Sequence, residues 1–456
     1  MKKERIAALF LVLLLCVPLT PFARAESDFD VDAKAALLVD LSSGETLYEK
    51  NSHERNYPAS ITKVMTALLV FEAVDAGRLK LDQEITASAE AFDGLSADGS
   101  TANIKSGETM SVENLLNCLL IVSANEASHI LAEAVAGSVQ NFVLQMNQRA
   151  EQLGCVDTQF ANPSGYHHER HYTTAWDIYL ITREAMKHDE FMKIVGRKAY
   201  TVPATNISKA RELHSTNYLI STWYTGWPGY FYEDAIGIKT GSTPEAGYCL
   251  VASAVRGSRQ LVSVVLGAER VKLDSGANET RSFTESARLL DHGFDDFKRM
   301  ELLSADEFIQ EVPVELSSET NYVVAHPAES LECMVPADLE AEDLTRTVTL
   351  HADPVYAPIA EGDELGTITI SYGDVEYGVI PLLALNDVSA SWLLTKRHEL
   401  MEFLSQPWVR RAAIGAAALA AGLVVLRVAA VSRARRYRGR RGGAGYNGSY
   451  RGRRKR

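Results

Sequence analysis

The 456-residue chain is poor in cysteine, with five in all. Cys16 falls inside an apolar run near the N-terminus, and the others, Cys118, Cys155, Cys249 and Cys333, form no C-x-x-C pair. This spacing excludes a zinc ribbon and a thioredoxin-type site. Because a chain of this length needs no disulfide staples, we interpret each of the four as a small buried apolar residue. The sequence leaves open whether any two of them oxidise.

Basic residues are scarce over most of the chain. The whole sequence carries a formal charge of -13. Residues 1–25 contribute +3 and residues 409–456 contribute +14, so residues 26–408 carry -30. A surface this acidic repels phosphate groups, which excludes nucleic acid as a partner. It suits a soluble domain outside the cytoplasm.

Long apolar runs are absent except at the two ends. Residues 1–25 combine a basic start, a short apolar run and the sequence Ala-Arg-Ala, which predicts a secretory signal peptide. A lipoprotein signal is the alternative, but it needs a small residue where Leu15 precedes Cys16. Cleavage places the mature N-terminus near Glu26.

The second apolar run predicts a transmembrane helix at residues 409–431. Arg427 is its only charge after residue 411, and about twenty such residues cross a bilayer. Residues 432–456 follow with eleven Lys or Arg and no acid. The positive-inside rule therefore predicts a cytoplasmic tail and a single-pass protein with its folded part outside. A soluble Ala-rich helix with a nucleic-acid-binding tail is the alternative, which the signal peptide disfavours.

The pattern between these ends predicts an α+β fold in two domains. Residues 34–49 read as a hairpin and residues 234–267 as an antiparallel meander. The helices expected are 60–78, 111–135, 138–153 and 282–298. These segments predict a first domain of antiparallel sheet with a helical subdomain over residues 26–300. Short alternating strands predict an all-β domain at 303–386, and residues 391–406 read as an amphipathic juxtamembrane helix.

The stretch "YPASITKVM" places Ser60 three residues before Lys63 at the start of a predicted helix. Residues three apart share a helix face, so the amine reaches the hydroxyl. The free N–H groups of a helix N-terminus offer a place for an acyl oxyanion. Lys63 acts as a base only when neutral, which burial and a neighbouring cation favour.

Two further motifs supply what a serine nucleophile needs. "IVSANEAS" contains Ser123 and Asn125, a hydroxyl able to relay a proton and an amide able to hold a substrate amide. "GIKTGST" presents Lys239, Thr240 and Gly241 on a predicted strand: a cation, a hydroxyl and a backbone open to close approach. Each motif is weak alone, but the three in this order indicate one site.

Ser-x-x-Lys, Ser-x-Asn and Lys-Thr-Gly are the three motifs of the serine penicillin-recognising enzymes. Stretches such as "YPASITKVMTALLVFE", "FVLQMNQRAEQLGCVDTQFANPSGYH" and "GIKTGSTPEAGYCLVASAVR" resemble the low-molecular-mass D-alanyl-D-alanine carboxypeptidases. The resemblance covers roughly residues 30–300, and residues 303–386 resemble that family's C-terminal domain. It implies the β-lactamase/transpeptidase-like fold and removal of the terminal D-alanine from peptidoglycan pentapeptides, without metal or other cofactor. It also implies covalent inhibition by β-lactams.

The resemblance assigns roles to matching positions. Ser60 would attack the carbonyl of the penultimate D-alanine, and Lys63 would take its proton. Ser123 and Asn125 would relay a proton and hold the substrate. The other matching residues would bind the terminal carboxylate or, with the N–H groups of Ser60 and Ser242, form the oxyanion hole: Lys239, Thr240, Gly241, Ser242 and Arg281.

The sequence departs from the family pattern in two places. Glu126 follows Ser-x-Asn where relatives often have aspartate, and Ser242 follows Lys-Thr-Gly where relatives carry histidine or another residue. Either change could tune turnover without altering the reaction. The membrane end also differs, because many relatives lie on the membrane by an amphipathic helix alone.

Four other functions remain open at this stage. A β-lactamase shares the three motifs, but residues 126–238 contain no E-x-x-L-N pattern. A metallopeptidase could use the histidines of "YHHERHY", which are His167, His168 and His171. A D,D-endopeptidase uses the same motifs on crosslinked substrate. A non-catalytic penicillin-binding sensor would keep the fold without turnover.

Overall fold

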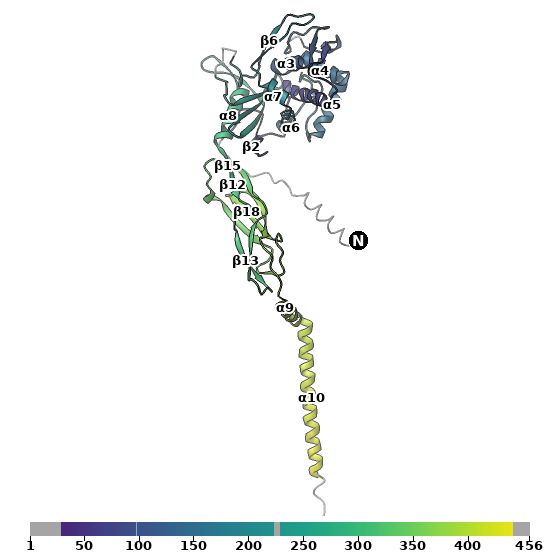
Figure 1. Cartoon of the computed structure of the whole chain (residues 1–456), viewed down its shortest axis with the longest axis vertical. Coiled ribbons are helices and arrows are strands. Elements are labelled where there is room, and N and C mark those ends of the chain that lie inside the picture. The colour runs from purple at the N-terminus through teal and green to yellow at the C-terminus, as the bar shows by residue number, and fades with distance from the viewer. Residues whose placement is uncertain (1–28, 97, 223–228, 441–456) are drawn as a thin grey trace, which may run out of the picture. The chain divides into compact units, whose positions relative to one another are not determined.

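The computed structural model describes residues 29–96, 98–222 and 229–440 (Figure 1). The predicted signal peptide, Cys16 and residues 441–456 of the basic tail lie outside these ranges. The strands are β1 (Ala35–Asp40), β2 (Thr46–Lys50), β3 (Glu84–Thr86), β4 (Thr109–Ser111), β5 (Ala199–Val202), β6 (Arg211–His214), β7 (Ala235–Thr243), β8 (Gly247–Arg256), β9 (Arg259–Ala268), β10 (Arg270–Lys272), β11 (Asn278–Thr280), β12 (Phe297–Leu303), β13 (Gln310–Glu315), β14 (Tyr322–Pro327), β15 (Leu331–Pro336), β16 (Thr345–Leu350), β17 (Val355–Tyr356), β18 (Glu364–Tyr372) and β19 (Val375–Ala384).

The helices alternate with these strands along the chain. The α-helices are α2 (Lys63–Asp75), α3 (Val112–Ile121), α4 (Asn125–Ala136), α5 (Val139–Gln152), α6 (Ala175–Ala185), α7 (Asp189–Val195), α8 (Arg281–Asp295), α9 (Trp392–Ser405) and α10 (Pro407–Arg440), and the 3-10 turns are η1 (Ala59–Thr62), η2 (Glu90–Phe92) and η3 (Ala341–Asp343).

The chain divides into two compact units. One runs to Leu302 and includes Glu332–Leu344 and Tyr372–Val375; the other holds the remaining residues from Leu303 onward. The chain therefore crosses between the units more than once after Leu302. The domain bounds 26–300 and 303–386 remain predictions.

The first unit is built on a five-stranded antiparallel sheet in the order β2-β1-β9-β8-β7. Both expected β segments are present, and the N-terminal hairpin joins the meander where β1 pairs with β9. Strand β2 forms one edge of the sheet, and β7 forms the other. That edge carries the Lys-Thr-Gly motif.

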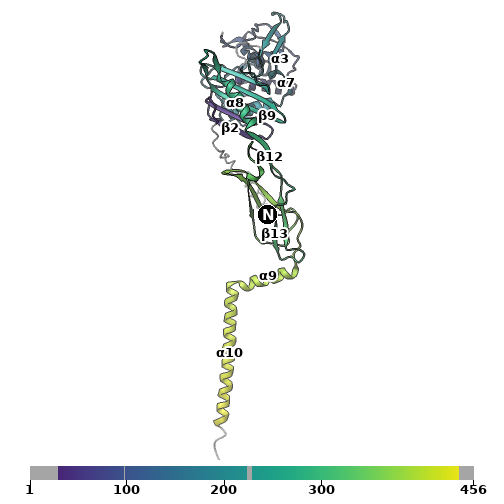
Figure 2. The same ribbon diagram turned by 90° about the vertical axis from the view of Figure 1, so that its left-hand side faces the viewer.

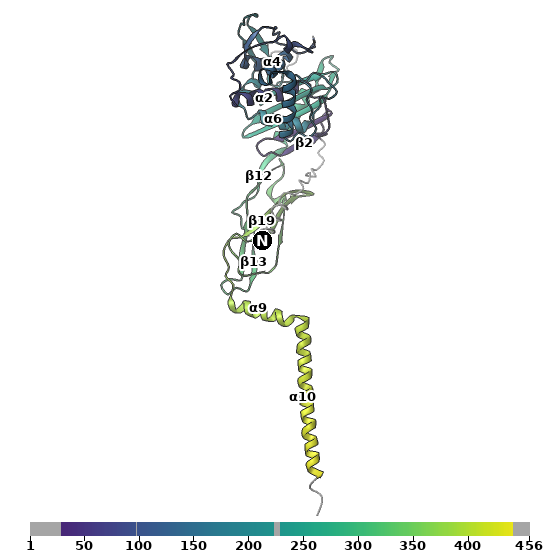
Figure 3. The same cartoon turned by 90° about the vertical axis from the view of Figure 1, so that its right-hand side faces the viewer.

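Both faces of this sheet are buried, which explains the near-continuous apolar runs of β1 and β9. On β9, Val262, Val264 and Leu266 pack into the core formed with the helices around α2. Leu261 and Val265 point the other way, into the core shared with α8. Figures 1 and 2 show α8 on one side of the sheet, and Figure 3 shows α2, α4 and α6 forming the opposite layer. The α+β architecture predicted from the sequence is confirmed.

The predicted single helix 111–135 is wrong in one respect, because it breaks between α3 and α4. Ser123 lies in this break with φ of +63°, a left-handed conformation that no helix interior accepts. Ala124 then has an extended ψ, so α4 starts afresh at Asn125. The sequence does not signal the end of a helix here, because residues 122–125 contain neither Gly nor Pro. The break brings the Ser-x-Asn motif to a helix N-terminus.

The second unit contains a six-stranded sheet in the order β16-β18-β19-β14-β13-β17. Leu365, Ile368 and Ile370 of β18 are buried. The two isoleucines alternate with threonines on the other face of the strand, as a period-2 pattern predicts. The all-β character expected for residues 303–386 is confirmed.

Two helices follow the β-sheet. Helix α9 corresponds to the predicted juxtamembrane helix. It ends before Gln406, which has an extended ψ of 134°, as expected for a residue that precedes proline. Helix α10 is the one helix in residues 29–96, 98–222 and 229–440 long and apolar enough to cross a membrane, with the apolar stretch at Pro407–Arg435. It extends beyond the predicted end at residue 431 because the first residues of the basic tail continue it to Arg440.

Candidate active site

Ser60 lies in the 3-10 turn η1 that precedes α2, and its side chain is half-buried. Lys63, the first residue of α2, is fully buried. Its Nζ lies 2.9 Å from Ser60 Oγ and donates hydrogen bonds to Asn125 Oδ1 at 2.8 Å and to the Ser164 carbonyl at 2.6 Å. The amine is thus aimed at the serine by two acceptors from other elements.

The surroundings of Lys63 disfavour its charge. Burial lowers the pKa of Lys63 well below its ordinary value, and the nearby Lys239 cation lowers it further, against an opposing effect of the Glu126 carboxylate. Lys239 is itself buried, which lowers its pKa to about 7. A neutral amine within hydrogen-bond reach of a hydroxyl is what a general base for serine requires.

Ser123 and Asn125 flank the break between α3 and α4. The Ser123 hydroxyl is buried and has no hydrogen-bond partner among the residues that the structure describes. An unpaired buried hydroxyl carries a free-energy cost that a bound substrate would relieve. Asn125 Oδ1 accepts a hydrogen bond from Lys63 Nζ, and the backbone N–H of Asn125 donates to the Ser100 carbonyl at 2.8 Å.

The Lys-Thr-Gly motif lies on β7, directly against the η1 turn that carries Ser60. A Cβ added to Gly241 would lie 2.9 Å from both the Pro58 carbonyl and the Ser60 nitrogen, so only glycine allows this approach. Lys239 Nζ donates to the Thr240 carbonyl at 3.0 Å. Ser242 is exposed on the same strand, opposite Tyr248 of β8.

Arg281 is not brought into this cluster by the contacts of the described residues. It is the first residue of α8, where its guanidinium forms an ion pair with Asp32. Its backbone N–H donates to the Glu269 carbonyl at 3.0 Å. The expected second carboxylate-binding arginine therefore has another partner, and its role remains a prediction.

Two residues that the motifs did not single out belong to the cluster. Thr216 shares a 2.8 Å hydrogen bond with Thr240 through their hydroxyls. Ser164 offers the carbonyl that accepts from Lys63. The turn residues "NPSG" before His167 were a signal for the Ser164 loop, whereas nothing local to Thr216 indicated its place beside β7.

Gly165 allows the loop that contains Ser164 to approach the η1 turn that carries Ser60. Its φ is +84°, and a Cβ there would lie 1.8 Å from the Ala59 carbonyl. We expect Gly165→Ala to lower both the melting temperature and the rate of acylation by penicillin, because Ala59 and Ser60 must move. Gly137 is the matched control, since its φ is +76° with nothing within 4 Å. Gly137→Ala should cost only about 1 kcal/mol of unfolding free energy, with acylation unchanged. Equal effects of the two substitutions, measured by calorimetry and stopped-flow acylation, would contradict this account.

The three histidines considered for a metal site serve different purposes. His171 is buried, and its Nε2 lies 2.8 Å from Thr62 Oγ1. His168 accepts from the Arg170 N–H, and His167 packs edge-on against Tyr57. Within the described residues no group of three His, Cys, Asp or Glu is placed to hold a metal ion.

A polar groove of about 710 Å³ opens beside residues 54–57, which lead into the η1 turn. Tyr57, which precedes Ser60 by three positions, lines it together with Glu245 at the turn between β7 and β8. Tyr172 and Arg55 form another part of its wall, with the guanidinium 4.4 Å from the ring centroid. Among the lining residues that the structure describes, none belongs to the three motifs.

Two family patterns match this chain. Residues 22–270 match peptidase family S11, described as D-alanyl-D-alanine carboxypeptidase. Residues 297–390 match the C-terminal domain of penicillin-binding protein 5.

Individual relatives agree. The chain is 31% identical over 399 residues to the D-alanyl-D-alanine carboxypeptidase DacF of Bacillus subtilis, covering 87% of this chain and 97% of that protein. It is 32% identical to DacC of Escherichia coli, over 78% of this chain and 84% of the relative. Among solved structures, the carboxypeptidase DacD of Francisella tularensis superposes with a TM-score of 0.65 at 26% identity, covering 82% of this chain and 98% of that one. Penicillin-binding protein 5 of Haemophilus influenzae gives a TM-score of 0.58 at 28% identity, over 80% and 100% of the two chains.

Proposed function

The chain belongs to the D-alanyl-D-alanine carboxypeptidases of peptidase family S11, and on this premise we propose that Ser60 is its nucleophile and Lys63 its general base. The protein is a serine carboxypeptidase of the penicillin-binding class. The observation that carries the assignment is the 2.9 Å contact between Lys63 Nζ and Ser60 Oγ, made by a fully buried amine beside a second cation.

The substrate we propose is a peptidoglycan stem pentapeptide ending in D-Ala-D-Ala. Lys239 and Thr240 receive its terminal carboxylate, with Thr216 holding the Thr240 hydroxyl in place. Lys63 takes the proton of Ser60 as Oγ bonds to the carbonyl carbon of the penultimate D-alanine. The oxyanion is stabilised by the N–H groups of Ser60 and Ser242.

Collapse of the tetrahedral intermediate breaks the peptide bond. The Lys63 proton passes through Ser123 to the departing nitrogen, so that D-alanine leaves with a neutral amine. Asn125 holds the amide of the acyl part. Water then attacks the acyl ester, again with Lys63 as base, which regenerates Ser60 and releases the tetrapeptide.

The decisive test is release of D-alanine from a peptide ending in D-Ala-D-Ala, measured with residues 26–408 of the parent and with Ser60→Ala. We expect release by the parent and none by the variant. No release from either protein, with penicillin still labelling the parent, would overturn the proposed reaction and favour an endopeptidase or a sensor.

We also propose that the catalytic unit lies outside the cytoplasmic membrane, anchored by α10 with the basic tail inside. The apolar stretch of α10 and the eleven basic residues after it support this topology. In intact protoplasts, a membrane-impermeant maleimide should label Ser318→Cys, which is exposed, but not Ser449→Cys in the tail. The buried native cysteines keep the background low. Labelling of Ser449→Cys in intact protoplasts would reverse the topology.

A further inference from the structure

Glu126 is a buried carboxylate that the proposed reaction does not use. It follows Asn125 directly in the first turn of α4 and is 4% exposed. Its Oε1 accepts hydrogen bonds from Thr101 Oγ1 at 2.7 Å, the Ala102 N–H at 2.8 Å and the Ile104 N–H at 3.4 Å. All three donors belong to residues 99–104, which we call the strap.

The strap lies directly against Asn125. The Ser100 carbonyl accepts the backbone N–H of Asn125 at 2.8 Å. A Cβ on Gly99 would lie 2.5 Å from Asn125 Nδ2, so the strap borders the amide nitrogen itself. Because Lys63 occupies Oδ1 of Asn125, this nitrogen is the end of the amide left for substrate. The strap therefore limits where the substrate-holding group can point.

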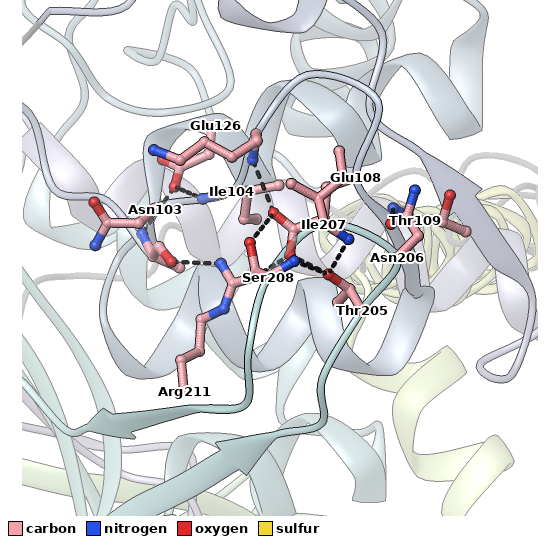
Figure 4. A network of polar contacts seen from close by, with 12 residues as sticks. Asn103, Ile104, Glu108, Thr109, Glu126, Thr205, Asn206, Ile207, Ser208 and Arg211 are labelled. Atoms are coloured by element: carbon pink, nitrogen blue, oxygen red, sulfur yellow. Dashed lines mark hydrogen bonds and ion pairs between the residues drawn. The ribbon is translucent and has the colours of Figure 1, made fainter.

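A second buried carboxylate, Glu108, is connected to the strap through Arg211. Glu108 pairs with Arg211 of β6 and accepts from the hydroxyls of Thr205 at 2.8 Å and Ser208 at 3.1 Å. Arg211 also donates to the Ala102 carbonyl at 2.7 Å. Figure 4 shows the Glu108 carboxylate within this network, with Glu126 to one side and Arg211 below. Glu108 thus supports the strap indirectly, by holding the arginine that donates to it.

We propose, resting on the proposed function, that Glu126 is a positioning residue for the carboxypeptidase reaction: it fixes the strap and thereby orients the amide of Asn125 toward the substrate. A carboxylate is suited to this because one oxygen can accept several convergent donors. The same position places its negative charge within reach of Lys63.

The charge of Glu126 can be tested through the pH dependence of the reaction, which a purely structural role would leave unchanged. The groups that act on or respond to Lys63 are Lys239 from β7, Glu126 and His129 from α4, and His171 from the Ser164 loop. Of these, Glu126 alone raises the pKa of Lys63. Burial and the nearby cation lower the pKa of His129 to about 4, so that ring is neutral in the working range. Removing the Glu126 charge should therefore let Lys63 lose its proton at lower pH.

The test compares Glu126→Gln, Glu126→Asp and Glu126→Ala in full-length protein, with rates expressed per molecule able to be acylated by penicillin. Glutamine keeps an acceptor for the three donors but loses the charge. We expect Glu126→Gln to retain at least about a third of the parent kcat/KM, with the acidic limb of its pH profile moved to lower pH. Glu126→Ala should lose about 30-fold in kcat/KM, since small displacements of a holding group are costly. Glu126→Asp should recover part of that loss.

Two controls separate positioning from folding. Glu108→Gln should lower the melting temperature but leave the acidic limb in place, because Glu108 faces Arg211. Gly99→Ala pushes on Asn125 Nδ2 without touching Glu126, so it should lower kcat/KM by about tenfold with the acidic limb unchanged, and it serves even if Glu126→Ala does not fold.

The outcomes also distinguish this inference from the function on which it rests. If neither the parent nor Ser60→Ala releases D-alanine in the same assay, the proposed function itself is overturned. If the parent is active and both Glu126→Ala and Gly99→Ala keep the parental kcat/KM, the role of Glu126 is overturned while the proposed function stands. An unmoved acidic limb in Glu126→Gln would overturn that role as well.

Discussion

In the variant Lys63→Met, kcat/KM for D-alanine release is expected to fall by about 10³-fold while the protein remains folded. Methionine fills the space of the lysine stem but brings no amine. Ser60 then has no base, and the Asn125 and Ser164 oxygens lose their donor. Loss of these hydrogen bonds is offset by removing a buried amine, so the unfolding free energy should change by no more than about 3 kcal/mol. A D-alanine release assay measures the first effect and a thermal melt the second, and stopped-flow kinetics with penicillin follow acylation directly.

Lys63→Arg is the informative control. It keeps a cation and several donors, but a guanidinium does not give up its proton at any usable pH. If Lys63 acts as a base, the arginine variant should be as inactive as the methionine variant. Substantial acylation by Lys63→Arg would show that the position needs only a positive charge, which contradicts the mechanism.

The second large effect concerns pH and Lys239. Burial lowers the pKa of Lys239 to about 7, yet the terminal carboxylate needs its charged form. We therefore expect kcat/KM, which reports the free enzyme, to decline above about pH 7. A bound carboxylate favours the ammonium, so kcat should decline only at higher pH. Below the optimum, both parameters should fall as Lys63 gains a proton.

Two substitutions separate the roles of Lys239. Lys239→Arg keeps the cation at all pH values, which should remove the alkaline limb. Lys239→Met should lower kcat/KM by about 10²-fold, because the substrate carboxylate loses its partner. It should also move the acidic limb to higher pH, since the cation that helps keep Lys63 neutral is gone. An acidic limb that stays in place in Lys239→Met would contradict the coupling of the two lysines.

Local spacing was sufficient for part of this site. Ser60 and Lys63 are three apart, and any helical or 3-10 backbone brings such residues to one face. The β-rich runs and the turn residues within 234–267 likewise predicted the strands that position Lys239. These features depend on residues that are close together along the chain, and they can therefore be predicted from the sequence.

Other features depend on chain segments that meet only in the folded protein. Ser123 adopts a left-handed conformation that its neighbours do not signal. Thr216 reaches Thr240 across 24 positions, and Ser164 reaches Lys63 across 101. Arg281 could be matched to the family by position, but its pairing with Asp32 arises from the approach of α8 to the N-terminal segment. Tertiary contacts of this kind leave no periodic trace in the sequence.

The most direct test of Ser60 as the nucleophile is the site of covalent attachment. After reaction with penicillin, acid quenching and trypsin digestion, mass spectrometry should find the residue 56–63 peptide heavier by the whole mass of the antibiotic, because the β-lactam ring opens without losing a fragment. Fragmentation should place the adduct on Ser60, and Ser60→Ala should show none. An adduct on Ser123 or another residue, retained in Ser60→Ala, would contradict the account.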